Sequence, residues 1–176
     1  MTTAHLFIDE TKDRDYLLVA SVHPSSDLDP LRKLMRGMVL KGQHRIHMKK
    51  ESDPRKRMIA AAICGVGVQA TIYDAGRHHR NELEARAACL HGVVTDLDPH
   101  TPNLLVLEQD DSLIDFDRRQ LYTITRTKQL HGVRYEHRRA SAEQLLAIPD
   151  AIAWCWAKGG DWRRRIEPAV TVVRSV

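Results

Sequence analysis

The order of its apolar segments is the feature that most restricts the fold of this chain. Short apolar runs with the length and pattern of β-strands occur at residues 4–10, 15–23, 66–73, 103–107 and 133–138. Between these runs, apolar residues recur at helical spacing. Strands interleaved with helices are typical of an α/β sheet that carries helices on its faces. We therefore expect an α/β protein with a sheet of about five strands, the first two forming a hairpin.

Local signals place the helices. A proline at the first helical position follows a capping Ser52-Asp53 pair, and Ser141 and Gln144 have the spacing of a capping box. Residues 46–48 are expected to form a short additional strand. We expect helices at about residues 28–38, 53–65, 80–96, 112–128 and 141–156.

The 176 residues suit a single domain, with residues 159–176 as a C-terminal extension. Hydrophobic residues make up 43% and charged residues 28% of the chain, a composition that excludes a mainly disordered protein. The valines of the extension indicate either an added edge strand or a segment exchanged with a second copy in a homodimer. The sequence leaves both alternatives open.

Two classes of protein are excluded by the pattern of apolar and cysteine residues. No apolar run approaches the length of a membrane span, and residues 1–10 lack the features of a secretory signal. We therefore expect a cytoplasmic protein with no membrane partner. Cys64, Cys89 and Cys155 are odd in number and widely spaced, so we expect reduced core residues rather than disulfides or a zinc site.

The charges are unevenly distributed along a chain whose net charge is +4. Residues 41–58 contain seven basic side chains against two acidic ones, and residues 118–139 contain seven against one. Residues 108–117 hold five acids and neither lysine nor arginine. A nuclease needs carboxylates for metal ions and cations for substrate phosphates, and this layout supplies both. The alternative is that each run is a solvated helix face.

Three acids lie at the margins of apolar sequence. Asp9 ends the first predicted strand, Glu108 ends a later one, and Asp150 lies within the last predicted helix. If the two strands are neighbours, their ends bring the acids to one edge of the sheet, where the helix can present Asp150. Such a cluster suits Mg²⁺ or Mn²⁺. The alternatives are that Asp9 begins a turn, Glu108 caps a helix and Asp150 faces solvent.

Several segments together resemble one family. Phe7-Ile8-Asp9-Glu10-Thr11 resembles the hydrophobic-Asp-Glu-Ser opening of the domain of unknown function 3800 family, which belongs to the ribonuclease H-like superfamily. The likeness continues in residues 46–49 and 52–55, in the strand at 104–108 and in the helix at 145–153. Each motif is short, so the order and spacing of the motifs carry the resemblance.

The resemblance implies a ribonuclease H-like mixed sheet and a divalent-metal-dependent nuclease that hydrolyses nucleic-acid phosphodiester bonds. It implies Mg²⁺ or Mn²⁺ as cofactor and Asp9, Glu108 and Asp150 as catalytic acids. Further metal ligands are expected at Glu10 and Asp110, and the middle acid stays ambiguous among Glu108, Asp110 and Asp111. Contacts to DNA or RNA are expected from the basic segment, at His47, Lys49, Lys50, Arg55 and Arg57.

Pro149 is the main departure from the family pattern. It stands where the family usually has alanine, and Ala147 stands where glutamine is common. A proline inside a helix removes a backbone donor and kinks the helix, which would move Asp150 away from the strands. The alternative to a nuclease is therefore a catalytically inactive ribonuclease H-like binding or assembly module.

Overall fold

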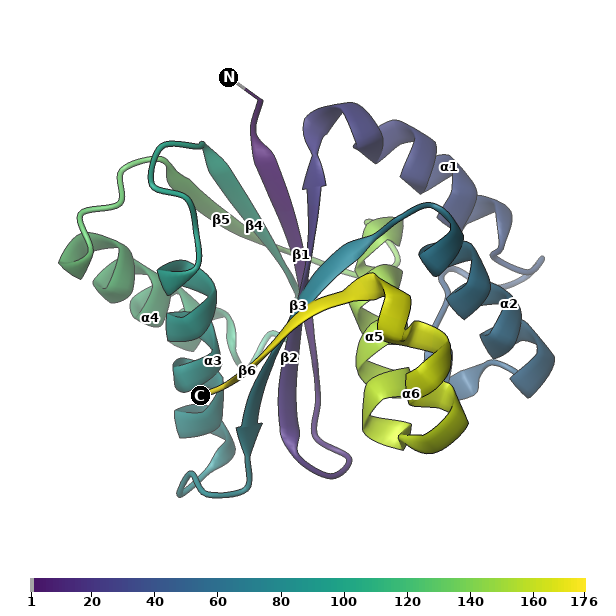
Figure 1. Ribbon diagram of the computed structural model, residues 1–176. Coiled ribbons are helices and arrows are strands. Elements are labelled where there is room, and N and C mark those ends of the chain that lie inside the picture. The colour runs from purple at the N-terminus through teal and green to yellow at the C-terminus, as the bar shows by residue number, and fades with distance from the viewer. Residues whose placement is uncertain (1) are drawn as a thin grey trace.

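The computed structural model describes residues 2–176 and contains a six-stranded sheet with helices on both faces (Figure 1). The strands follow the spatial order β5-β4-β1-β2-β3-β6. They are β1 (Ala4–Thr11), β2 (Tyr16–Pro24), β3 (Gln69–Gly76), β4 (Asn103–Glu108), β5 (Val133–Arg138) and β6 (Val170–Ser175). The predicted α/β class is confirmed. The predicted number of about five strands is one too few, because the C-terminal extension contributes β6.

The sheet is mixed. Strands β1, β2 and β3 form an antiparallel meander, which confirms the predicted hairpin of β1 and β2. Strand β4 pairs parallel with β1, β5 pairs parallel with β4, and β6 pairs parallel with β3. The C-terminal ends of β1, β4 and β5 therefore lie at one edge of the sheet.

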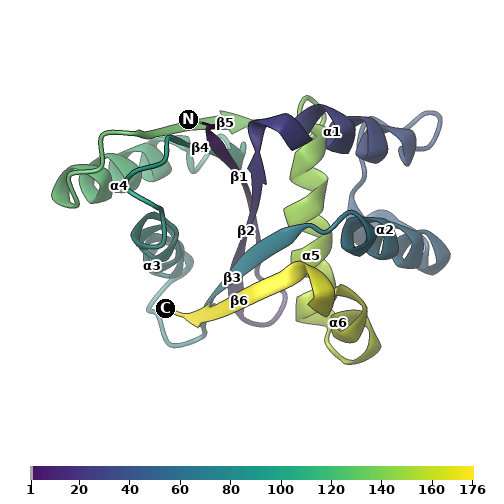
Figure 2. The ribbon, with the colours of Figure 1, turned by 45° about the horizontal axis from the view of Figure 1, so that its top comes forward.

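The helices form two layers, one on each side of the sheet (Figure 2). The first layer contains α3 and α4, and the second contains α1, α2, α5 and α6. The helices are α1 (Leu28–Gly37), α2 (Asp53–Gly65), α3 (Glu82–Thr95), α4 (Ile114–Thr127), α5 (Ala147–Lys158) and α6 (Gly160–Ile166). None of the helices in residues 2–176 is both long enough and apolar enough to cross a membrane.

The central strand β1 is buried on both faces. Phe7 packs into the core beneath α1, α2 and α5, whereas Leu6 and Ile8 pack into the core beneath α3 and α4. Side chains alternate along a strand, so Asp9 shares a face with Phe7 and Glu10 shares a face with Ile8. This alternation sends the two adjacent acids into different layers.

Two predicted strand boundaries are wrong. Residues 46–48 form no strand: Ile46 and Met48 are buried in the core, and Met48 begins a short 3-10 turn, Met48–Lys50. Strand β3 begins at Gln69 instead of Val66. Gly67 has a φ of +74°, a left-handed conformation that ends the segment after α2, and Val66 is half exposed beside it.

The start of the last predicted helix is also corrected. A 3-10 turn at Gln144–Leu146 leads into α5, and the carboxylate of Glu143 accepts a hydrogen bond from the Leu145 N–H at 3.1 Å. The predicted capping box of residues 141 and 144 is therefore wrong. Pro149 falls in the first turn of α5, where a proline costs little because the first amides lack intrahelical acceptors. The helix continues without interruption to Lys158, so the expected kink does not occur.

The C-terminal extension belongs to this chain's own sheet. A short helix that the sequence analysis did not predict, α6, packs against α5, with the rings of Trp162 and Trp154 edge to face at 5.1 Å. Strand β6 then lies along β3 as the edge strand. All three cysteines are free, as predicted. Cys89 and Cys155 are buried, and Cys64 is only half-buried.

Candidate functional site

Strands β1 and β4 bring two of the three predicted acids side by side. The parallel register pairs Ile8 with Leu107, so Asp9 and Glu108 follow together at the same edge. Residues two apart in a strand share a face. Asp9 follows Phe7 by two residues and Glu108 follows Val106 by two, so both acids lie on the α5 face. The predicted adjacency of the two strand ends is therefore present in the structure.

Helix α5 supplies the third acid. It packs across β1 and β2, and its first turn carries Asp150. The Asp150 Oδ2 atom accepts a hydrogen bond from the backbone N–H of Met48 at 2.9 Å. The 3-10 turn that replaces the predicted strand thus holds Asp150 in place.

The pKa values of two of these carboxyl groups show that the acids influence one another. Burial, followed by the charges of Glu108 and Asp150, raises the pKa of Asp9 well above its usual value. Burial also raises the pKa of Asp150 to about 6, with a further increase from Glu108 and an opposing effect of the Met48 N–H. Buried carboxylates that face one another are costly unless protons or cations neutralise them.

Arg45 provides one positive charge in this cluster. Its Nη1 atom lies 3.2 Å from Glu108 Oε1, and both side chains are partly buried. Arg45 belongs to the basic run of residues 41–58 but was not among the predicted site residues. No local signal marks this contact, because the two residues are 63 positions apart.

Glu10 lies beside the three acids at the end of β1, but its carboxylate is engaged elsewhere. Its carboxylate lies on the opposite face and forms an ion pair with Arg86 at 3.1 Å. Arg86 in turn donates two hydrogen bonds to Asp117, at 2.6 and 2.8 Å. The side chain that follows Asp9 in the sequence is therefore part of a separate buried network, which the sequence analysis did not predict.

The other predicted acids lie in the loop after β4. Asp110 is exposed and accepts hydrogen bonds from the backbone N–H and the hydroxyl of Ser112, at 3.0 and 2.6 Å. Asp111 pairs with Arg139 at 3.3 Å. Both residues precede α4 and line a hollow together with Asp9 and Glu108. Glu108, which follows the register pair of Ile8 and Leu107, is the acid directly beside Asp9.

The predicted basic contacts separate into two groups. His47 and Lys49 line a hollow of about 280 Å³ together with Asp150 and Glu10. The exposed Lys12 lines it as well, with its ammonium paired to Glu82 at 2.9 Å. Lys50 and Arg57 are exposed and do not line this hollow. Arg55 is half-buried and pairs with Glu51 at 2.6 Å, so its guanidinium stabilises the loop before α2.

A second hollow, of about 510 Å³, opens on the other side of the acids. Among the described residues, its lining contains one cation, Arg139, and five acids: Asp9, Glu10, Glu108, Asp110 and Asp111. One hollow therefore reaches Asp150 and the other reaches the two strand-end acids. Basic side chains line both hollows, but within residues 2–176 the second holds five acids against Arg139 alone, so bound cations would have to neutralise it before an anionic ligand could lie over the carboxylates.

The donor chemistry of the cluster suits a hard divalent cation, since all three side chains offer carboxylate oxygens. In residues 2–176, however, no group of three His, Cys, Asp or Glu side chains is arranged so that it could hold a metal ion as it stands. Glu108 is engaged by Arg45, and Asp150 by the Met48 N–H. Metal binding at this cluster would therefore require side-chain rotation.

The comparisons with known proteins add no family assignment to this geometry. No family model matches the sequence. No curated protein matches it either. What can be said of its function therefore depends on the arrangement of these residues.

Proposed function

We propose that this protein is a divalent-metal-dependent nuclease of ribonuclease H-like type that hydrolyses nucleic-acid phosphodiester bonds. One observation carries the proposal: Asp9, Glu108 and Asp150, far apart in the sequence, gather on one face at one edge of the sheet. Their positions on the first strand, on a neighbouring parallel strand and on α5 are those that the resemblance to the domain of unknown function 3800 family implies. Pro149 no longer argues against this arrangement.

Each acid would have a distinct part in holding Mg²⁺ or Mn²⁺. Bound divalent ions supply a water of lowered pKa and stabilise the leaving oxygen of an in-line displacement. Asp9 is the most buried of the three and forms the floor of the cluster, whereas Glu108 and Asp150 are partly exposed. The latter two would have to exchange their bonds to Arg45 and the Met48 N–H for bonds to metal.

The polynucleotide would lie over the two hollows. His47 and Lys49 stand beside Asp150, and Arg139 stands beside Glu108. Cationic side chains at these positions favour a phosphate backbone without reading its sequence. Lys50 and Arg57, which are exposed, would extend this contact, whereas Arg55 would act through the loop that it stabilises. DNA and RNA are equally compatible with such contacts.

A metal titration tests the proposal. We expect Mg²⁺ or Mn²⁺ to raise the melting temperature of the wild-type protein, and Asp9→Asn to abolish that increase. Asp29→Asn is the matched control, because Asp29 is an exposed acid on α1. The same three proteins are then incubated with DNA, RNA and hybrid substrates in Mn²⁺. Cleavage that persists in Asp9→Asn, or its absence for every substrate in the wild type, would contradict the proposal.

A second candidate is a catalytically inactive module of the same fold that binds nucleic acid or assembles with a partner. The contact of Arg45 with Glu108 favours it, because a guanidinium already neutralises one of the acids. This candidate predicts that neither Mg²⁺ nor Asp9→Asn changes the affinity for a labelled oligonucleotide in a filter-binding assay. The nuclease predicts that both change it.

A further inference from the structure

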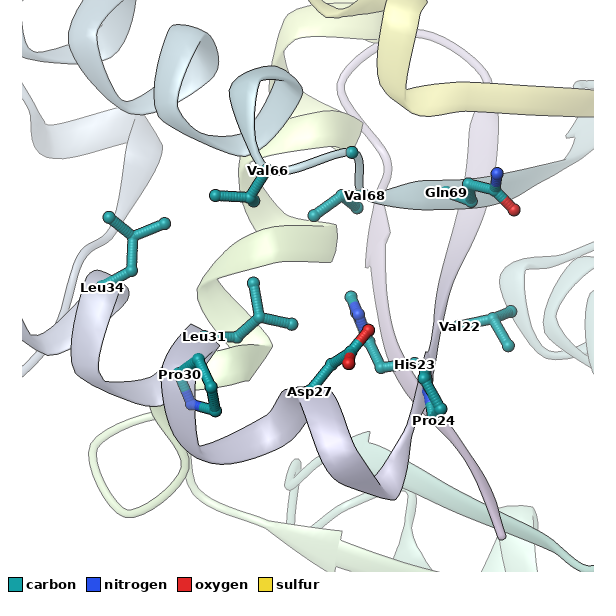
Figure 3. Close-up of a pocket in the computed structure, with 11 residues that line it drawn as sticks. Val22, His23, Pro24, Asp27, Pro30, Leu31, Leu34, Val66, Val68 and Gln69 are labelled. Carbon is teal, nitrogen blue, oxygen red and sulfur yellow. The ribbon is translucent and has the colours of Figure 1, made fainter. Parts of the chain in front are cut away.

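A cavity of about 610 Å³ opens at the other end of the sheet from the three acids (Figure 3). Its floor includes His23, which pairs with His5 across the β1–β2 hairpin, whereas Asp9 pairs with Val19. The cavity lies between the end of β2, helix α1 and the turn from α2 to β3. Its volume is that of a small-molecule site, which typically measures about 300–1,000 Å³.

The walls of the cavity are mainly apolar. Leu31 and Leu34 of α1 face Val66 and Val68 of the turn before β3 (Figure 3). Val66 is 50% exposed, and Leu34 opposite it is only partly buried. Large apolar side chains exposed around a hollow are typical of a binding surface, since their contact with water is unfavourable.

One polar side chain is buried in this cavity without a partner. His23 is only 3% exposed, and its Nε2 atom has no hydrogen-bond partner among the residues that the structure describes. Its ring packs against Phe7 at 5.9 Å and points into the cavity (Figure 3). An unpaired buried nitrogen costs free energy, which a ligand that hydrogen-bonds to it would recover.

The protonation state of His23 determines which hydrogen-bonding group a ligand must provide. Burial lowers the pKa of His23 to about 4, although the nearby carboxylate of Asp27 opposes this effect. The ring is therefore neutral near pH 7. With its proton on Nδ1, a neutral imidazole presents Nε2 as a hydrogen-bond acceptor, which calls for an N–H or O–H donor.

The charged residues of the lining determine whether a cationic or an anionic ligand is favoured. Asp27 contributes a carboxylate, and within residues 2–176 the lining contains no lysine or arginine. Gln69 adds a neutral amide at the rim. Asp27 is exposed and accepts a hydrogen bond from the Ser26 hydroxyl at 3.2 Å. With no cation among the described lining residues, its carboxylate favours a cationic ligand over phosphates and nucleotides.

We propose that this cavity binds a small amine with an aromatic or other apolar body. The ammonium group would pair with Asp27 and donate an N–H to His23 Nε2, while the body would pack between Leu31 and Val66. One ammonium group has three N–H donors and can serve both partners. The proposal is independent of the nuclease proposal, because the two sites share no residue.

A titration followed by ¹H–¹⁵N NMR of the full chain tests the proposal with three probes of one shape: benzylamine, benzyl alcohol and benzoate. Benzylamine is expected to cause saturable shifts in the amides of Leu31, Leu34, Val66 and Gln69 at millimolar concentration. Benzyl alcohol should bind about tenfold more weakly, a loss of about 1.4 kcal/mol, and benzoate should not bind. Benzoate binding as tightly as benzylamine, or no saturable shift with benzylamine, would overturn the proposal.

Variants locate the interaction. Asp27→Asn should reduce the affinity for benzylamine to that for benzyl alcohol, and Val66→Trp should block both probes by filling the cavity. Val173→Trp is the matched control, because Val173 is a similarly exposed valine on the far edge strand β6. Binding that survives Val66→Trp would contradict this site.

Sedimentation of the unliganded protein tests the competing occupant, a second copy of this chain. We expect wild type and Val66→Trp to have the same mass. If the wild type is a dimer that Val66→Trp dissociates, the cavity is a contact between subunits and the ligand proposal fails.

Discussion

At the end of β1, neighbouring acids on the two faces of the sheet have opposite surroundings. On the α3–α4 face, Glu10 and Asp117 share the guanidinium of Arg86, and His137 Nε2 lies 2.9 Å from Asp117. On the α5 face, Asp9 faces two further acids, and the nearby guanidinium of Arg45 contacts Glu108. The first arrangement satisfies its charges and suits a structural role. The second leaves negative charge that a ligand can neutralise. The first network is therefore suited to stabilising the fold, and the second cluster to binding.

Breaking the satisfied network should have the largest effect. Arg86→Met would leave Glu10 and Asp117 without their shared cation in the core, where removing one partner of a buried pair costs about 3–5 kcal/mol. Urea unfolding followed by circular dichroism measures the loss. Arg80→Met is the control, because Arg80 is exposed just before α3 and its ion pair with Glu84 is worth about 0–1 kcal/mol. Equal losses in both variants would show that the network does not stabilise the fold.

The same network predicts a pH dependence. Burial alone would raise the pKa of Asp117, but hydrogen bonds and charges from Arg86 and His137 hold this pKa below its usual value. A carboxyl group with a lowered pKa in the folded state contributes stability above its unfolded pKa and loses it as the pH falls through the folded pKa. Asp117→Asn should therefore cost about 3 kcal/mol near pH 7 and progressively less below about pH 4. Unfolding free energies across this range measure the difference, and a constant difference contradicts the prediction.

The spacing of the apolar residues predicted most of the strands and helices. It did not predict the side-chain contacts that distinguish the two faces of the sheet. The apolar run of β4 correctly predicts that Glu108 ends a strand, whereas β1 continues past Asp9 to Thr11, so the prediction that Asp9 ends its strand is wrong by two residues. The two acids become adjacent once β1 and β4 pair. No periodicity indicates that Arg86, on α3, reaches Glu10 and Asp117. Such contacts join residues far apart in the sequence, and only the packed fold brings them together.

Local signals were misleading where tertiary contacts decided the structure. Residues 46–48 have strand-like character, but burial of Ile46 and Met48 and the bond from the Met48 N–H to Asp150 hold them in a turn. Glu143, instead of Ser141, caps the approach to α5. In both places a distant partner or a neighbouring side chain offered a better hydrogen bond than the predicted element.

On the α5 face, removing a charge should have the opposite sign. Asp9→Asn removes a buried carboxylate that Glu108 and Asp150 repel, so in EDTA near pH 7 it should raise the free energy of unfolding by about 1 kcal/mol. The measurement is again urea unfolding, with Asp29→Asn as the exposed control. A loss of stability in Asp9→Asn without metal would mean that the two faces are alike and that Asp9 is structurally satisfied.

The smallest effect is expected for a substitution of Arg45. It distinguishes an α5 face that binds a divalent cation from one in which Arg45 already neutralises the acids. Its pair with Glu108 is partly exposed, so Arg45→Met should cost about 0.5–1 kcal/mol in EDTA. If the guanidinium competes with a divalent cation for Glu108, the same variant should bind Mg²⁺ more tightly, because no cation then occupies the Glu108 carboxylate. Isothermal titration calorimetry measures this affinity directly, with Arg139→Met as the control, because Arg139 lines the hollow beside Glu108 but pairs with Asp111. Unchanged or weaker Mg²⁺ binding in Arg45→Met would mean that Arg45 does not compete with the cation, and the α5 face would then resemble the satisfied face.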